Sequence, residues 1–133
     1  MKWRLLFLIA GILLVSGCAQ DLKKEHEKYL SHKGWELKDL VEVESYILDI
    51  PAEMIRNYEA SGVTFLNSYT GEVVSAYTYN LQEKDDNGER LKAVLFEVEE
   101  EIIGGYGILP SWTPGIFSLD EKDRLIEEQL VQE

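Results

Sequence analysis

An apolar segment near the N-terminus constrains this chain most, because it ends close to the only cysteine of the sequence. The segment runs from Leu5 to Val15 and follows two basic residues, Lys2 and Arg4, as in a secretory signal peptide. It is well short of the roughly 20 residues that a helix needs to cross a bilayer. We therefore expect a leader that is removed, rather than a permanent transmembrane helix.

The cysteine itself predicts a lipid anchor. An aliphatic residue, Val15, and two small residues precede Cys18, which matches the bacterial lipobox. In a lipobox the thiol receives a diacylglyceryl group, and the cleaved chain begins at the cysteine. Two acyl chains supply the double anchor that stable membrane attachment requires. The predicted location is the extracytoplasmic face of the cell membrane.

These features divide the chain into a signal peptide at 1–17, the lipidated cysteine with a short tether at 18–24, and a single domain at 25–133. With Cys18 carrying lipid, no thiol remains for a disulfide, a metal site or a nucleophile. A small extracytoplasmic domain without disulfides depends on its hydrophobic core for stability.

The chain is acidic, with a formal net charge of −12, and its leader contains bases but no acids. The domain itself is therefore even more acidic. This balance argues against nucleic acid and against anionic lipid headgroups as partners, and by itself it indicates solubility rather than a function.

Hydrophobic spacing predicts helices and strands in the first half of the domain. A helix that Asp21 could cap ends at Gly34, and a second helix begins at Pro51 and ends at Gly62. Between them, residues 35–50 alternate between apolar and polar side chains, which is typical of a half-buried strand.

The second half predicts an antiparallel sheet. Alternating residues at 73–81, the turn sequence EKDDNGE and the apolar run 91–98 form one hairpin, and Ile102 and Ile103 begin a further strand. The glycines Gly104, Gly105 and Gly107 lack a following helix, so they indicate a bulge or close backbone contact rather than a phosphate loop. We expect an α+β fold: an antiparallel β-meander of three to five strands, with N-terminal, middle and C-terminal helices packed on one of its faces.

The C-terminal region offers two interpretations. Residues 118–121 fit a capping box, and the helix after them places Leu125, Ile126 and Leu130 on one side. This apolar side either packs on the sheet or binds a partner. Trp112, in a predicted loop, is a further candidate for partner binding.

Several segments together resemble a known family. YLSHKGWEL, DIPAEM with Tyr58, SYTGEVVSAYTY and EIIGGY are similar to the family called domain of unknown function 4830, over about residues 28–109. The resemblance implies a secreted or lipid-anchored protein of a Gram-positive bacterium. It implies no activity.

The remaining residues give little sign of covalent chemistry. His26 and His32 lie about 120° apart around a helix, so they do not form a metal-binding pair. Residues 83–88 imitate half a calcium loop, but Val94 stands where the bidentate glutamate belongs, so a hairpin turn is the better interpretation. A weak cation site on these carboxylates stays open, and we expect no cofactor.

The sequence thus favours a small binding or regulatory module that is anchored to the membrane through lipid on Cys18. Its partner would be an extracytoplasmic protein or the cell wall. The alternative is a small cell-wall hydrolase, which would need two carboxyl groups converging in a cleft, at least one with a shifted pKa.

Overall fold

The structure is a computed structural model that describes residues 23–113 and 115–132. The predicted signal peptide and Cys18 lie outside these residues. The helices are α1 (Lys24–His32), α2 (Ala52–Ala60) and α3 (Lys122–Glu127), with a turn of 3-10 helix, η2 (Leu66–Tyr69). The strands are β1 (Leu37–Ile47), β2 (Val73–Lys84), β3 (Arg90–Val98), β4 (Glu101–Ile108) and β5 (Ile116–Phe117).

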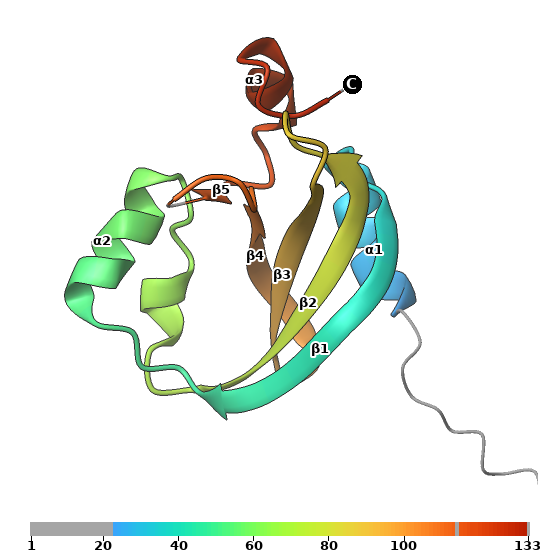
Figure 1. The fold of residues 1–133 in the computed structure, drawn as a ribbon. Coiled ribbons are helices and arrows are strands. Elements are labelled where there is room, and N and C mark those ends of the chain that lie inside the picture. Colours follow the sequence, from blue (N-terminus) through green and yellow to red (C-terminus); the bar gives the residue numbers. More distant parts are fainter. Residues whose placement is uncertain (1–22, 114, 133) are drawn as a thin grey trace, which may run out of the picture.

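The five strands form one antiparallel sheet in the order β1-β2-β3-β4-β5, so each strand pairs with its neighbour in sequence (Figure 1). This confirms the predicted α+β fold with a β-meander. The turn between β2 and β3 is also as predicted. Asp85 Oδ1 accepts hydrogen bonds from the backbone N–H groups of Asn87 and Glu89, both at 2.9 Å, and Gly88 has a φ of 82°. These are the marks of a tight turn closed by an aspartate side chain.

The helices lie on both faces of the sheet, so the expectation that they share one face is wrong. The physical reason is visible in β3, where both faces carry apolar side chains and each needs a cover. Leu95 belongs to the cluster that contains Leu30 of α1, and Phe96 belongs to the cluster that contains Ile55 of α2. Figure 1 shows α1 behind the curved sheet and α2 on its opposite side.

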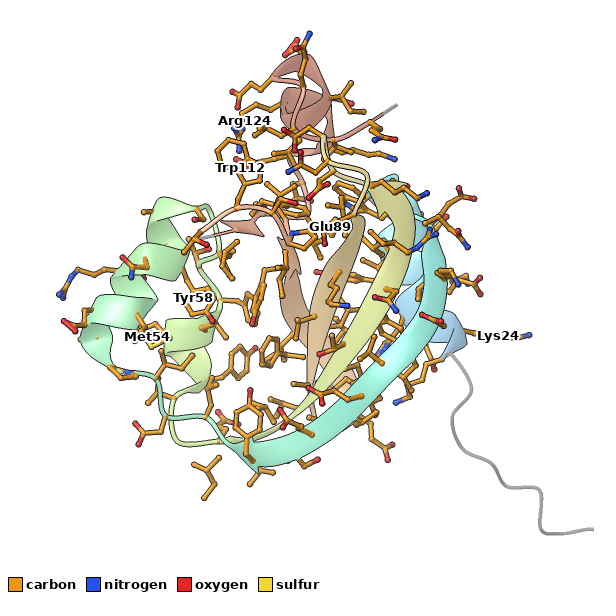
Figure 2. The ribbon with its side chains drawn as sticks, in the orientation of Figure 1. Lys24, Met54, Tyr58, Glu89, Trp112 and Arg124 are labelled. Carbon is orange, nitrogen blue, oxygen red and sulfur yellow. The ribbon has the colours of Figure 1, made fainter. Side chains whose placement is uncertain are left out.

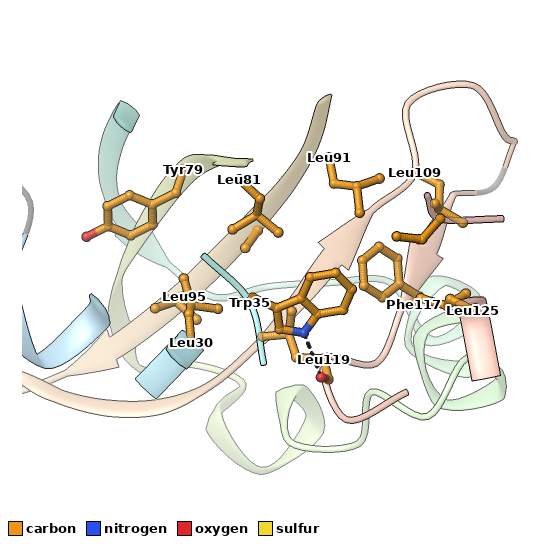
Figure 3. Packing of buried hydrophobic residues seen from close by; sticks show 12 residues of the cluster. Leu30, Trp35, Tyr79, Leu81, Leu91, Leu95, Leu109, Phe117, Leu119 and Leu125 are labelled. Carbon is orange, nitrogen blue, oxygen red and sulfur yellow. Dashed lines mark hydrogen bonds between the residues drawn. The ribbon is translucent and has the colours of Figure 1, made fainter. Parts of the chain in front are cut away.

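The larger cluster, on the α1 face, is built around Trp35 (Figure 3). The Trp35 ring lies 5.5 Å from that of Phe117, and its Nε1–H donates to the backbone oxygen of Leu119 at 2.8 Å. The indole is therefore buried with its only polar group satisfied. This contact joins the loop after α1 to the segment that leads into α3.

The glycines of β4 allow close packing, which confirms their predicted role. A side chain at Gly105 would place its Cβ 2.5 Å from a methyl carbon of Leu95, and one at Gly107 would overlap the ring of Phe117. A register shift in the pairing of β3 with β4, between Phe96 and Glu97, marks the bulge. Leu95 and Phe117 can therefore pack directly against the backbone of β4.

Strand β1 differs from the prediction of a half-buried strand. Only Leu37 and Leu40 are partly buried, and every residue from 41 to 47 is exposed. The alternation is real, but β1 stands at the edge of the sheet and no described helix covers this half of it. Alternation shows which side chains share a face, and it does not show whether that face is covered.

Candidate functional site

The structure separates the four residues predicted to bind a partner. Leu125 is 1% exposed and belongs to the core around Trp35, so its prediction as a contact residue is wrong. Ile126 and Leu130 are half-buried and pack against the same core. Helix α3 thus docks on the fold, because its apolar side completes that core. The predicted capping box is also absent: the Ser118 hydroxyl accepts from the N–H of Asp120, and Glu121 at the N-cap makes no side-chain capping bond.

Of these four residues, only Trp112 is exposed, with 46% of its surface accessible to a partner. Figure 2 shows it on the loop below α3, well away from the exposed half of β1. Cys18, the predicted lipidation site, lies outside the described residues, and its role stays a prediction from the sequence.

A cluster of polar side chains that the sequence did not reveal lies where α1 meets the sheet. We call it the Glu97 network; its members are Lys23, His26, Tyr77, Tyr79 and Glu97. His26 Nε2 lies 2.5 Å from Glu97 Oε2, and His26 Nδ1 lies 2.5 Å from Tyr79 Oη. Lys23 Nζ donates to both Glu97 oxygens, at 3.1 and 3.0 Å, and to Tyr77 Oη at 3.2 Å.

The partners of His26 define its protonation state. Glu97 can only accept, so Nε2 carries the proton, while the Tyr79 hydroxyl donates to Nδ1. Burial lowers the pKa of His26, although its contact with Glu97 acts in the opposite direction. Burial also raises the pKa of Tyr79 to about 12. The histidine is therefore neutral and the tyrosine protonated at neutral pH, with every polar atom of the pair bonded.

The Glu97 network is a structural joint rather than a reaction centre. His26 and Tyr79 are both 0% exposed, so no substrate can reach them. Lys23 is the residue before α1, and its pair with Glu97 joins the start of the helix to the middle of the sheet. The chain that arrives from the N-terminal side is thus fixed to the sheet at its first described residue.

A shallow groove beside this network tests the hydrolase alternative. Glu97 lines it together with Glu25, Glu100 and Glu101, so several carboxyl groups do meet there. Glu97, however, is buried, and its carboxylate is already bonded to Lys23 and His26, so it is not free to act on a substrate in the groove. This groove does not provide the paired acid and base that glycoside hydrolysis requires.

The described residues contain no group of three or more histidine, cysteine or acidic side chains arranged to hold a metal ion. In the turn that imitates a calcium loop, Asp85 is fully buried and already bonds the turn backbone. The pKa of Asp85 is lowered, because the bonds from the turn backbone favour the charged carboxylate more than burial opposes it. Its carboxylate therefore acts within the turn.

Exposed apolar side chains are concentrated at one place. Seven large hydrophobic residues are exposed in the described ranges, and five of them lie on β1 or at the start of β2. These five are Val41, Val43, Tyr46, Ile47 and Val73, with exposed fractions between 40% and 63%. The other two, Met54 on α2 and Trp112, lie apart from β1 and from each other in Figure 2.

The exposed half of β1 has a regular backbone. Its pairing with β2 shifts twice before Glu42, and from Glu42 to Ile47 it proceeds without a shift. We call this six-residue stretch, 42–47, the β1 edge. No strand among the described residues pairs with its outer side, because β1 is terminal in the sheet.

The two faces of the β1 edge differ in chemistry. Val43 and Ile47 pair with Tyr77 and Val73, so they lie on the α1 face of the sheet. Glu42 and Glu44 alternate with them and lie on the α2 face, since Glu44 pairs with Ala76 of the second cluster. The α1 face of the edge therefore carries an apolar row, Val43 and Ile47 with Ser45 between them, and the α2 face carries Glu42 and Glu44 followed by Tyr46.

No described helix is long and apolar enough to cross a membrane. Scans of the sequence against protein-family models and curated proteins, and of the fold against solved structures, found no match. The resemblance to domain of unknown function 4830 thus gains no support from them and remains an expectation from the sequence.

Proposed function

We propose that this chain is a lipid-anchored extracytoplasmic binding module, which recognises a partner protein noncovalently through the β1 edge. The observation that carries the binding role is the concentration of exposed apolar side chains on β1 and the start of β2. Contiguous exposed apolar surface is uncommon on soluble domains and usually marks an interaction site. The lipobox ending at Cys18 supports the anchored location.

The short tether supports a function close to the membrane. Between Cys18 and Lys23 the chain can extend at most about 18 Å, since an extended residue spans about 3.3 to 3.6 Å. Lys23 is bonded to Glu97, so the tether begins at the sheet itself. The lipid would therefore hold the domain, and with it the β1 edge, near the membrane surface.

The proposal is tested by photo-crosslinking in living cells. A photoreactive residue replaces Ile47 in the full-length chain, and the matched control carries it at Met54, which is also exposed and apolar but lies on α2. We expect one discrete protein adduct from position 47 and none from position 54. Equal adducts from both positions, or none from either, would contradict the proposed role of β1.

A further inference from the structure

We infer that the β1 edge binds an extended segment of the partner protein as a sixth strand, and that this segment alternates basic with apolar residues. This inference rests on the proposed function and adds the geometry of binding and the chemistry of the partner. In strand addition, the main chain of the guest bonds to a free sheet edge, and its side chains contact those of the edge strand on both faces.

The backbone of β1 is suited to accept a strand only along the β1 edge. Proteins protect free edges with bulges and charged side chains. The first half of β1 has both, with shifts of register before Asp39 and before Glu42 and an ion pair of Lys38 with Asp39 at 3.8 Å. From Glu42 to Ile47 the strand is regular, and its outer side is unpaired within the described residues.

The side chains of the edge specify the guest. A strand added beside it would place alternate residues against Glu42 and Glu44 on one face and against Val43 and Ile47 on the other. Both glutamates are exposed, and neither has an ion-pair partner among the described residues. Opposite charges on facing strands stabilise the pairing and like charges destabilise it, so the first row selects lysine or arginine and the second selects apolar residues.

A second copy of this chain fits the edge poorly. Two β1 edges paired antiparallel around a twofold axis would bring the same faces together. With the twofold axis at Val43, Glu42 of each copy would face Glu44 of the other, and with the axis at Ser45 the two Glu44 side chains would be diagonal neighbours. Their repulsion adds to that between two chains with a net charge of −12 each. The charge pattern therefore favours a basic guest over self-association.

The test uses the full-length lipidated chain in an uncharged detergent and synthetic peptides of alternating sequence. One peptide alternates lysine with valine or threonine, a second replaces every lysine by glutamate, and a third carries N-methyl groups on all amides of the basic sequence, so that neither edge of it can pair. We expect the basic peptide to bind and to protect the backbone amides of residues 42–47 from hydrogen exchange. The acidic and N-methylated peptides should bind at least about tenfold more weakly.

Charge reversal supplies the matched comparison. Glu42→Lys with Glu44→Lys should weaken the basic peptide about tenfold or more and allow the acidic peptide to bind. Asp123→Lys with Glu127→Lys makes the same change of charge on exposed positions of α3 and should leave both affinities nearly unchanged.

Several results would overturn the inference. The inference fails if the N-methylated peptide binds as tightly as the basic peptide, or if the α3 variant loses as much affinity as the β1 variant. It also fails if the basic peptide does not bind or does not protect residues 42–47, or if the chain self-associates through these residues. If any of these occurs while Ile47 still crosslinks to one protein in cells, the binding module stands and only strand addition fails. If the crosslink is absent as well, both proposals fail.

Discussion

At His26 two physical effects act on one imidazole ring in opposite directions. Burial penalises the charged form, while the carboxylate of Glu97 favours it. The burial effect is larger, so the pKa of His26 is lowered. The ring then stabilises the fold as a neutral group, since it donates to Glu97 and accepts from Tyr79 at the same time.

This state predicts how stability depends on pH. In the unfolded chain His26 binds a proton near pH 6.5. In the folded protein its pKa is lowered, so it stays neutral until the pH is lower. The unfolded state therefore gains protons first, and the contribution of His26 is complete above about pH 6.5 and decreases as the pH falls below it. Thermal unfolding measured between pH 7.5 and pH 5 (about the range in which histidines titrate) should show this decrease.

Two variants separate His26 from the carboxyl groups. His26→Phe should lower the free energy of unfolding by about 2 kcal/mol or more at neutral pH, because Glu97 and Tyr79 lose their bonds to the ring, and should flatten the dependence below pH 6.5. His32→Asn, at an exposed position of the same helix, should leave the dependence unchanged. An NMR titration that places the pKa of His26 above 6.5 would contradict this account.

At the scale of elements, the structure decides which of the predicted apolar faces are covered. The sequence leaves open whether the apolar side of α3 packs on the sheet or binds a partner, and the place of Leu125 in the core shows that it packs. The alternation in β1 resembles a half-covered strand, yet the apolar row stays open. Local periodicity defines a face, and only the packing of distant elements decides which faces are covered.

The position of α3 predicts a difference between two alanine variants. Leu125→Ala should lower the free energy of unfolding by about 2 to 4 kcal/mol, because it leaves a cavity in the core around Trp35. Trp112→Ala should change it by less than about 1 kcal/mol, since nearly half of the residue is exposed and it belongs to neither core cluster. Chemical denaturation measures both values, and a small loss for Leu125→Ala would mean that α3 does not dock as described.

At the scale of the whole molecule, the sequence predicts the meander well because each β-hairpin is a local structure. The turn at Asp85 and the glycines of β4 carry their own signals of turn and close approach. The Glu97 network had no such signal. Lys23 and Glu97 are far apart in the sequence and meet only when α1 packs on the sheet. The position of Glu97 between Phe96 and Val98, at the end of the apolar run of β3, is the clue that a buried partner exists.

The proposed lipid anchor gives a prediction for the intact protein in its cell. Cys18→Ser removes the thiol that would accept the diacylglyceryl group, so the chain should either leave the membrane fraction or accumulate with its leader uncleaved. Fractionation followed by mass measurement distinguishes these outcomes. A Ser16→Ala variant, which keeps a small residue before the cysteine, serves as the control and should remain processed and membrane-bound. Full processing and membrane retention of Cys18→Ser would disprove the lipobox.

The measurement that tests the central claim most directly is the yield of the Ile47 crosslink in cells when the charge of the β1 edge is reversed. The account predicts one adduct with the native edge, a large loss with Glu42→Lys and Glu44→Lys, and little change with Asp123→Lys and Glu127→Lys. An adduct of the same size and yield in all three chains would show that the acidic β1 edge does not select the partner.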